Sequence, residues 1–497
     1  MTSRSFLLGI DLGTTTCRAV IFDFDGAVVA AAYKETRVSY PRPLWAEVDP
    51  EDWWRDTCAV VRDALARTGV PSTQIAAVGL SGLMHAPVLL DDEGKPVAPA
   101  QLWMDQRCAA QSEALHRDAT SATATGRVST GTGVSAPKIR WLAEQQPDVL
   151  KRARHFLLPK DFVRFRLTGR YLTDASDAGG TGMYDRASAK WNDEIVDWVG
   201  LSRDVLPTIS QASVFGGRVT AEAARQTGLP EGAPVAVGGA DTLCTRLGVG
   251  PMEPDEVCIY LGTAAWVSVT QGRGGDGQPI LRGFGATSTT GAALRWARDL
   301  LGFAGGAGAD DYRRLDHMAD EIPLGAEGLF FLPHLMGERG PHPDPLARGA
   351  LIGLTLRHGR SHLVRSILEG TAFQLRRVIE ARLLANPDFG RELSGGVVCG
   401  GGARSALWVQ ILSDVTGLTL RIPAVFEAAA LGAAMLGATA AGLGSLDEAS
   451  ARMIHYYSPR QPCRESSARY DGLFKRYCQL DDLLTPFFHE ADLSVTG

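Results

Sequence analysis

The stretch that decides the fold is FLLGIDLGTTTCRAVIFDFDGAVVAAA, residues 6–32. Its three largely apolar runs extend from Phe6 to Asp11, from Cys17 to Phe22 and from Ala27 to Ala32. Short turns rich in Gly, Thr and Asp separate these runs. Apolar runs punctuated in this way are typical of antiparallel strands. The stretch therefore predicts a three-stranded meander that opens an α/β domain.

The chain after this meander alternates between helical and extended patterns. From Glu51 to Thr68, apolar residues recur at helical spacing, which predicts a helix. The apolar run from Ile75 to Leu80 predicts a strand, which ends in the loop from Ser81 to His85. Strands that alternate with helices are typical of an α/β domain.

A similar pattern restarts in the second half of the chain. Val257 to Leu261 predicts a strand, Gly262-Thr263 a turn, and Ala265 to Thr270 a second strand. Farther on, the strand from Gly396 to Cys399 runs into three glycines and a helix from about Ser405 to Thr416. This duplication predicts two similar α/β domains facing a cleft, with the boundary near residues 245–255.

Composition limits the classes of function. At 497 residues the chain exceeds what one core usually supports. The net charge of −6 gives no electrostatic reason to expect nucleic acid or an anionic membrane as a partner. Eight scattered cysteines and an N-terminus that fits no signal peptide lead us to expect a cytoplasmic protein. The uncharged stretch from Ala428 to Gly444 is too weakly apolar to span a bilayer and predicts a buried helix.

Three loops have the composition of phosphate-binding turns. They are Asp11 to Thr15, Gly262-Thr263 and Gly400 to Ala403. Glycine lets backbone N–H groups approach an anion closely, and threonine hydroxyls add donors. Each loop alone is more simply a hairpin or strand–helix turn, but their joint occurrence favours a nucleotide site. The pattern GxxxxGK[ST] is absent from the sequence, which excludes a P-loop enzyme. The Gly-rich strand–helix junction that starts at Gly400 lacks the complete GxGxxG spacing and falls late in the chain, which disfavours a dinucleotide-binding fold.

Asp241 is the candidate catalytic group. It follows the apolar strand from Pro234 to Val237 and the pair Gly238-Gly239. An aspartate in this position by default turns the chain or caps a helix. Together with the phosphate-binding turns, it becomes a candidate general base.

These segments resemble the actin-like, or ribonuclease-H-like, ATPase superfamily, and within it the FGGY carbohydrate kinases. Two segments carry the resemblance: GVSAPKIRWLAEQ at residues 133–145, and GALIGL at residues 349–354 followed by HLVRSILE at residues 362–369. Further segments resemble the xylulokinases of this family: Ser81 to His85, Leu158 to Asp161, Ser176 to Ala178, Phe331 to His334 and Gly337 to Arg339. The resemblance extends from about residue 6 to about residue 442.

The resemblance implies an α/β fold of two ribonuclease-H-like (actin-like ATPase) domains around a central cleft. Residues 1–250 would bind the sugar and carry the catalytic Asp, residues 251–450 would bind the nucleotide, and residues 451–497 would form a helical extension. The implied reaction transfers the γ-phosphate of ATP to a small sugar, foremost D-xylulose. Another ketose, polyol or sugar acid, such as ribulose, erythrulose, glycerol or gluconate, is the alternative, and an actin-like ATPase interaction module is a remote one.

The resemblance also implies a role for individual residues. Asp241 would be the base, and Asp11 would be a catalytic residue that faces Mg²⁺ through water. The residues that would contact the sugar are Met84, His85, Trp103, Asp105 and Asp241. The residues that would contact ATP are Gly13, Thr14, Thr15, Gly262, Thr263, Gly401, Gly402 and Ala403. We expect no nucleic-acid or membrane partner, and a homodimer is one option for the assembly.

Two departures from the xylulokinase pattern lie at the expected sugar pocket. Xylulokinases usually carry Asn after the catalytic Asp, whereas this chain has Thr242. Ala86-Pro87 follows the Met-His pair where Gly is more usual. Both departures bear on the identity of the sugar and leave the kinase prediction intact.

Overall fold

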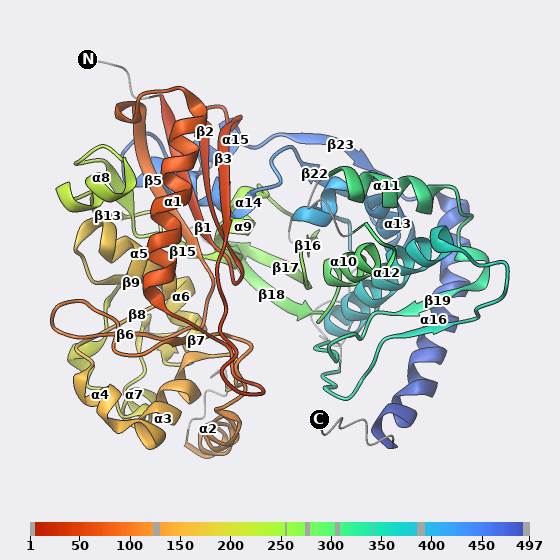
Figure 1. Cartoon of the computed structure of the whole chain (residues 1–497), viewed down its shortest axis with the longest axis horizontal. Coiled ribbons are helices and arrows are strands. Elements are labelled where there is room, and N and C mark those ends of the chain that lie inside the picture. Colours follow the sequence, from red (N-terminus) through yellow and green to blue (C-terminus); the bar gives the residue numbers. More distant parts are fainter. Residues whose placement is uncertain are drawn as a thin grey trace. The chain divides into compact units, whose positions relative to one another are not determined.

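The computed structural model describes residues 5–122, 130–253, 256–273, 279–303, 309–340, 342–384 and 393–490. The chain forms two compact units (Figure 1). Unit 1 comprises Met1–Gly250 and Glu427–Ile454, and unit 2 comprises Pro251–Phe426 and His455–Gly497. The break after Gly250 coincides with the expected boundary. Glu427–Ile454 differs from the expected bounds, because this segment packs on unit 1 although it lies late in the sequence.

Unit 1 is built on a seven-stranded sheet with the order β13-β14-β5-β1-β2-β3, and β15 pairs with β5 beside β14. The strands are β1 (Phe6–Leu12), β2 (Thr16–Asp23), β3 (Val28–Glu35), β5 (Ile75–Gly82), β13 (Phe215–Arg218), β14 (Pro234–Ala236) and β15 (Gly239–Ala240). The first three strands pair antiparallel, which confirms the predicted meander. β5 is parallel to β1, β14 and β15, so the carboxyl ends of these strands meet at one edge.

Two helices cover opposite faces of this sheet. α1 (Pro50–Thr68) lies over β2 and β3, and α14 (Ala428–Ala440) lies over β1 and β5. A Cβ atom at Gly9 would lie 1.9 Å from the Ala430 carbonyl oxygen, and one at Gly79 would lie 1.7 Å from that of Ala433. Only glycine permits this approach of helix to sheet. The predicted buried helix is thus confirmed, and its small side chains serve close packing.

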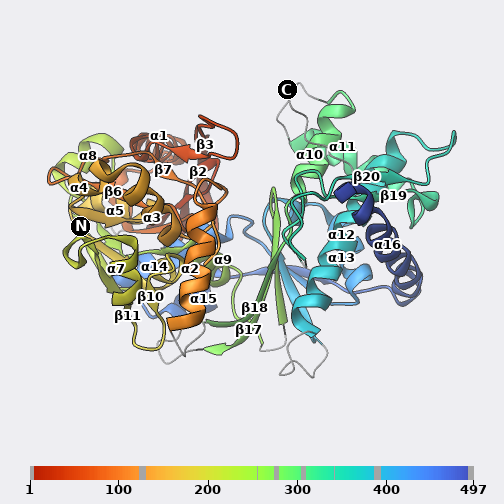
Figure 2. The same ribbon diagram turned by 90° about the horizontal axis from the view of Figure 1, so that it is seen from below.

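Many of the remaining elements of unit 1 lie together at one end of the sheet, below it in Figure 1 and toward the viewer in Figure 2. The remaining elements include β4 (Glu47–Val48), β6 (Val88–Leu90), β7 (Ala100–Gln101), α2 (Ala109–Ala122), α3 (Ser135–Gln145), α4 (Pro147–Arg152), β8 (His155–Leu157), α5 (Pro159–Thr168), β9 (Leu172–Asp174), α6 (Ala175–Gly180), β10 (Tyr184–Asp185), β11 (Lys190–Trp191), α7 (Asp193–Val199), β12 (Thr208–Ser210), α8 (Ala221–Thr227), α9 (Asp241–Gly248) and α15 (Leu446–Met453).

Unit 2 repeats the strand order of unit 1. Its sheet runs β18-β17-β16-β21-β22-β23, an antiparallel meander joined to two parallel strands and an antiparallel edge. The strands are β16 (Glu256–Leu261), β17 (Ala265–Arg273), β18 (Pro279–Ala286), β21 (Gly395–Cys399), β22 (Leu420–Pro423) and β23 (Tyr456–Arg460). This duplicated order is the one expected of two ribonuclease-H-like domains.

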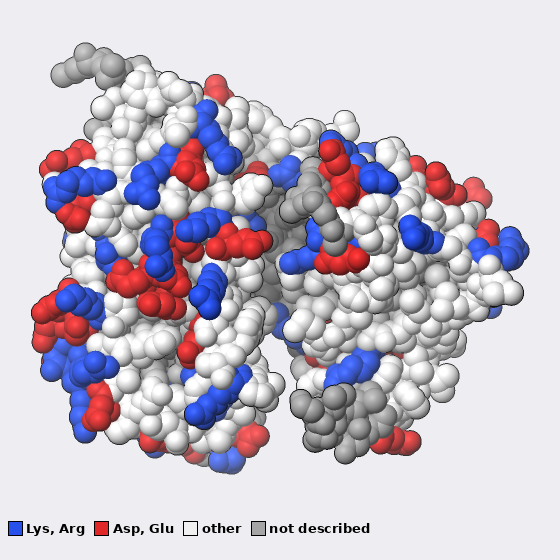
Figure 3. Space-filling model, in the orientation of Figure 1, with Lys and Arg blue, Asp and Glu red and all other residues white. Residues whose placement is uncertain are grey.

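The helices of unit 2 include α12, which contacts β17, β18 and β19, and α16, which contacts α12 and α13. Their bounds, with two short strands, are α10 (Gly291–Leu300), α11 (Ala309–Asp320), β19 (Phe330–Leu332), β20 (Ala350–Ile352), α12 (Arg360–Leu384), α13 (Ala406–Thr416) and α16 (Arg464–Glu490). Among the described residues, no helix is both long and apolar enough to cross a bilayer. On the face shown in Figure 3, basic and acidic side chains are interspersed.

Candidate active site

The two predicted catalytic carboxylates lie at the carboxyl ends of β1 and β15, the strands that flank β5 on its two sides in unit 1. Asp11 is the sixth residue of β1 and pairs in register with Ser81 of β5. The Ser81 hydroxyl donates to Asp11 Oδ1 at 2.8 Å, and Arg18 of β2 donates to Asp11 Oδ2 at 3.3 Å. Asp11 is 6% exposed. Its carboxylate is therefore fixed and points toward the edge where loops carry function in α/β sheets.

Asp241 lies on the other side of β5 from Asp11. Gly239 and Ala240 form β15, which pairs with Ser81 and Gly82, and Asp241 begins α9 immediately afterwards. The Thr242 amide donates to Asp241 Oδ1 at 2.6 Å. Asp241 is therefore the first residue of α9 and not its cap, because Ala240 holds the N-cap position and no described side chain caps this helix. It also stays partly exposed, so a substrate can reach it.

The surroundings of Asp241 suit a proton acceptor. Burial and the nearby Asp11 carboxylate raise the pKa of Asp241 to about 7, although the Thr242 amide lowers it. A general base works best when its pKa lies near the working pH. The geometry thus supplies a partly protected carboxylate with the basicity that proton abstraction from an alcohol requires.

The predicted sugar-contacting pair follows β5 directly. The Thr242 hydroxyl contacts the Met84 sulfur at 3.5 Å, so Met84 lies beside the residue after Asp241. His85 Nδ1 lies 2.6 Å from the Gly180 carbonyl oxygen. Because a carbonyl only accepts, Nδ1 carries the proton in this contact. A Cβ atom at Gly180 would lie within 3.0 Å of both Met84 and His85, so these side chains and α6 form one wall.

Trp103 and Asp105, both predicted to contact the sugar, make different kinds of contact. The Trp103 indole N–H donates to the Thr14 hydroxyl at 3.0 Å, which joins a predicted sugar contact to a predicted phosphate-binding turn. Asp105 is fully buried, and its oxygens accept from the Arg107 side chain at 2.7–2.9 Å and from the Ala46 amide at 2.7 Å. These contacts favour a structural role for Asp105 over sugar binding.

A buried charge network that our sequence reasoning missed supports the strand before Asp241. Lys160 is fully buried, and its ammonium lies 2.6 Å from Asp161, 3.0 Å from Asp174 and 3.1 Å from Asp177. Burial alone would lower the pKa of Lys160, but the three aspartates raise it. The signal in the sequence was the recurrence of Lys-Asp and Ser-Asp pairs, whose meeting needs the fold.

The network reaches the catalytic strand through one hydroxyl. Ser176 donates to Asp174 Oδ2, and the Ala240 amide donates to the Ser176 hydroxyl at 2.9 Å. The residue before Asp241 is thus tied to a rigid buried cluster. Ser176 therefore helps to fix the position from which the Asp241 side chain starts.

The predicted nucleotide residues of unit 2 meet at the end of β16. Gly262 and Thr263 form the turn between β16 and β17, and a Cβ at Gly291 would lie 2.4 Å from the Gly262 carbonyl oxygen. A Cβ at Gly400 would lie 2.7 Å from the Leu261 carbonyl oxygen. Glycines from three segments of the chain therefore pack closely at this point. The turn that follows Gly400 runs from Gly401 to Arg404 and carries Gly402 and Ala403.

Two arginines that the sequence analysis did not single out contact these site residues, one in each unit. Arg295, exposed on α10, donates to the Thr263 hydroxyl at 2.9 Å. Arg18 of unit 1 donates to Asp11, opposite which it pairs in the β1–β2 hairpin. The register of that hairpin, closed by Gly13 to Thr15, could have revealed Arg18. The contact of Arg295 with Thr263 depends on how α10 packs, so the sequence carried no local signal for it.

The oxygen donors of unit 1 fit a hard cation. The Asp11 carboxylate is close enough to Asp241 for its charge to raise the pKa of Asp241. Carboxylate oxygens and water are the ligands that Mg²⁺ prefers. A divalent cation near Asp11 would relieve the repulsion between the two carboxylates, so the residues present suit magnesium.

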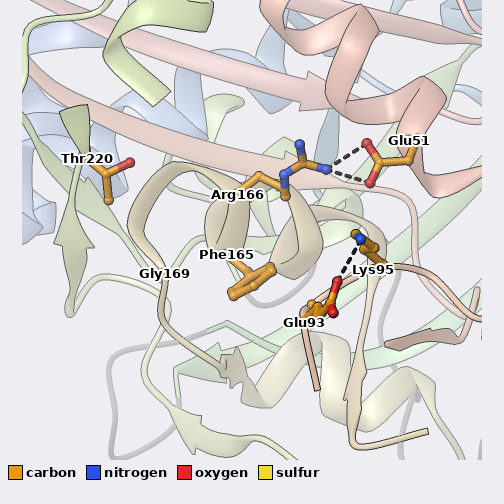
Figure 4. Close-up of a pocket in the computed structure, with 8 residues that line it drawn as sticks. Glu51, Glu93, Lys95, Phe165, Arg166, Gly169 and Thr220 are labelled. Carbon is orange, nitrogen blue, oxygen red and sulfur yellow. Dashed lines mark hydrogen bonds and ion pairs between the residues drawn. The ribbon is translucent and has the colours of Figure 1, made fainter. Parts of the chain in front are cut away.

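A depression on unit 1 lies apart from these residues (Figure 4). Arg166 reaches toward it and pairs with both Glu51 oxygens at 2.6 Å, and Lys95 pairs with Glu93 at 2.6 Å. Phe165, Gly169 and Thr220 complete much of its lining. Its basic groups are already matched by acidic ones, so the depression does not offer the charge pattern of an anion site.

Comparison with known protein families assigns the class to which this fold and site belong. Residues 6–248 match the N-terminal domain of the FGGY family of carbohydrate kinases, and residues 264–441 match its C-terminal domain. The chain therefore belongs to the FGGY family of carbohydrate kinases. It is an ATP-dependent sugar phosphotransferase, as the resemblance of its segments predicted.

Individual relatives match nearly the whole chain. Xylulose kinase of Escherichia coli strain K12 is 33% identical over 451 residues, covering 87% of this chain and 90% of the relative. Autoinducer-2 kinase of Yersinia enterocolitica is 31% identical over 502 residues, covering 95% and 93%. The crystal structure of xylulose kinase from Rhodospirillum rubrum superposes with a TM-score of 0.80 at 30% identity, covering 97% of this chain and 100% of that one.

Proposed function

We propose that this enzyme transfers the γ-phosphate of ATP to the terminal hydroxyl of D-xylulose, yielding D-xylulose 5-phosphate. The observation that carries the chemistry is the Asp241 carboxylate, whose pKa burial and Asp11 raise to about 7. The substrate is proposed because the compared relatives include xylulose kinases at 30–33% identity over most of their length. The eight free cysteines, six of them buried, support a reducing compartment such as the cytoplasm.

Asp241 acts as the general base in this proposal. Its carboxylate orients the attacking hydroxyl and accepts its proton as the bond to phosphorus forms. Phosphoryl transfer requires positioning and charge neutralisation more than covalent chemistry. His85 and Met84, which lie beside Thr242 and Gly180, position the sugar, while Trp103 lines the same region from the side of Thr14.

Asp11 and Arg18 handle the charge of the phosphates. Asp11 would hold Mg²⁺ through water, and the bound ion would neutralise the negative charge of the ATP phosphates. Arg18 contacts Asp11 directly and brings a guanidinium to the same turn. Thr14 and Thr15 lie in this turn and supply hydroxyl donors for phosphate oxygens.

Unit 2 binds the nucleotide in this proposal. Gly262, Gly291 and Gly400 let neighbouring segments pack closely at the end of β16, and a Cβ at Gly401 would meet nothing within 4 Å, so the backbone at Gly401 is open to a ligand. Thr263 and Arg295 add a hydroxyl and a positive charge at this point. Gly401, Gly402 and Ala403 follow as further backbone contacts.

The identity of the sugar depends on the residues of the proposed pocket, and Thr242 departs from the xylulokinase pattern there. The Thr242 hydroxyl, which replaces the usual amide, contacts Met84 and so narrows what this position offers a sugar. A buried donor or acceptor left without a partner costs about 1–3 kcal/mol, enough to change substrate preference. A different ketose or polyol is therefore the rival substrate, and one relative is an autoinducer-2 kinase.

The test is a coupled assay of ADP formation with D-xylulose, L-xylulose, D- and L-ribulose, erythrulose, glycerol, D-arabitol and gluconate. We expect the highest kcat/KM with D-xylulose. If another compound exceeded it by about tenfold, roughly 1.4 kcal/mol of transition-state preference, the substrate would be reassigned. If none of the compounds stimulated ADP formation, the proposed substrate class itself would be wrong.

A further inference from the structure

His85 has a backbone conformation that needs support. Its φ is +76°, in the left-handed region that residues other than glycine rarely adopt. Such conformations typically cost about 1–3 kcal/mol and persist when the surroundings determine them. His85 directly follows Met84 in the loop after β5, next to the proposed sugar position. The contacts that hold this residue are therefore of functional interest.

Two side chains from the first turn of α3 hold the His85 backbone. The Ser135 hydroxyl and the Lys138 ammonium each donate to the His85 carbonyl oxygen, both at 3.1 Å. Lys138 also donates to the Gly133 carbonyl oxygen at 2.7 Å. The imidazole is held separately by the Gly180 carbonyl. His85 is thus fixed at both its backbone and its side chain.

Lys138 is unusual among the buried lysines of this unit. Lys160 is buried with three aspartates against its ammonium, as expected for a structural charge. Lys138 is equally buried, but its hydrogen bonds within the described structure go to two backbone carbonyls. Burial lowers its pKa to about 7. Placing an amine there without an ion pair is costly, which indicates that the position of these carbonyls matters.

We propose that Lys138 is a positioning residue for catalysis: from the first turn of α3 it holds His85 in its left-handed conformation and thereby sets the imidazole against the sugar. The inference rests on the proposed role of His85 in sugar binding. Lys138 touches neither the sugar nor the reacting atoms in this scheme. Its effect passes through the His85 backbone, and Ser135 shares the same carbonyl.

The test is a double-mutant cycle between Lys138→Met and His85→Ala. Both single variants, the double variant and the control Lys151→Met, at an exposed lysine of α4, are assayed with D-xylulose and ATP in turn as the variable substrate. We expect Lys138→Met to lower kcat/KM for D-xylulose about tenfold and to leave KM for ATP within about twofold. In the His85→Ala background, Lys138→Met changes kcat/KM for D-xylulose less than about twofold. Ser135→Ala, a milder change at the same carbonyl, lowers it about threefold.

The outcomes separate this inference from the proposed function. A tenfold loss from Lys138→Met that persisted without His85 would overturn the positioning role, as would no loss at all. If His85→Ala itself had no effect on D-xylulose turnover, the proposed sugar contact would fail, and the inference with it. Should Lys138→Met not fold, the same cycle with Ser135→Ala decides: equal losses with and without His85 contradict the proposal.

Discussion

The two units share a strand order, yet the same turn carries different chemistry in each. In unit 1 the first strand ends with Asp11-Leu12 and is followed by Gly13-Thr14, and in unit 2 its counterpart ends with Tyr260-Leu261 and is followed by Gly262-Thr263. The position of Asp11 is taken in unit 2 by Tyr260, whose ring stacks on that of Trp266 with the ring centroids 5.4 Å apart. The Gly-Thr pair, which can approach phosphate, is common to both.

The difference shows that the fold is duplicated and its chemistry is divided. The paired carboxylates Asp11 and Asp241, with the Met84-His85 loop, belong to unit 1. Unit 2 contributes glycine turns that pack closely at the end of β16, with Gly401 left open beside them. Substitutions in unit 1 should therefore impair phosphoryl transfer to the sugar, and substitutions at the glycine turns of unit 2 should impair use of ATP.

The strongest way to break this comparison is Asp241→Asn. We expect kcat to fall about 10²–10⁴-fold, because an amide cannot accept the proton of the attacking hydroxyl. Binding of ATP, measured by calorimetry, should change little. The exposed aspartate Asp197, changed to Asn, is the matched control. A variant that kept kcat within threefold of wild type would remove Asp241 from the role of base.

The same variant should stabilise the fold at high pH. The raised pKa of Asp241 means that the folded protein binds this proton more tightly than the unfolded chain, so stability is lost as pH rises from about 4 through about 7. The shift bounds the gain at roughly 4 kcal/mol, and partial exposure reduces our expectation to about 1–2 kcal/mol. Denaturant titrations at pH 8 and pH 4 test this. A gain of equal size at both pH values contradicts the account.

Unit 2 is tested by Arg295→Ala and Thr263→Ala. Each removes one partner of the contact at the Gly262 turn. We expect KM for ATP to rise about tenfold for Arg295→Ala, equivalent to about 1.4 kcal/mol, and somewhat less for Thr263→Ala. KM for the sugar should stay within twofold in both. Arg313→Ala, at an exposed arginine of α11, is the control, and a larger effect on the sugar than on ATP would contradict the division between the units.

The smallest expected effect comes from Ser176→Ala, which cuts the link between the Lys160 cluster and Ala240. The change leaves the Ala240 amide without its acceptor, and we expect kcat to fall about threefold, or about 0.7 kcal/mol. KM for ATP should not respond. If kcat were unaffected while the protein kept its stability, the cluster would not help to position Asp241.

Much of the scaffold could be predicted from local patterns. The meander of β1 to β3, the strand β5 and the helix α13 each follow from a periodicity within a few residues. The position of Asp241 after a strand and two glycines was also readable, because the chain itself places it there. The assignment of α14 to unit 1 could not be predicted. Its Ala and Gly composition indicates close packing but does not identify the sheet that the helix covers.

The contacts that tune the site depend on residues far apart in sequence. Asp105 looked available to a sugar, but Arg107 and the Ala46 amide occupy its oxygens. The support of Ala240 by Ser176 spans 64 residues, and that of Thr263 by Arg295 spans 32. Such pairings arise from packing, so a single sequence gives the residue types but not their partners.

The central claim is that Asp241, whose pKa is raised by burial and by the Asp11 carboxylate, is a base that works near neutral pH. The most direct test is the pH dependence of kcat/KM for sugar-dependent ADP formation in wild type and His85→Ala. We predict that activity falls on the acid side with a midpoint above the usual range of an aspartate and no higher than about pH 7, because Asp241 must be deprotonated to act and Mg²⁺ offsets the Asp11 charge. The limb should persist in His85→Ala, which leaves the surroundings that raise the pKa of Asp241 in place. A flat profile between about pH 5.5 and 8.5 would contradict the account.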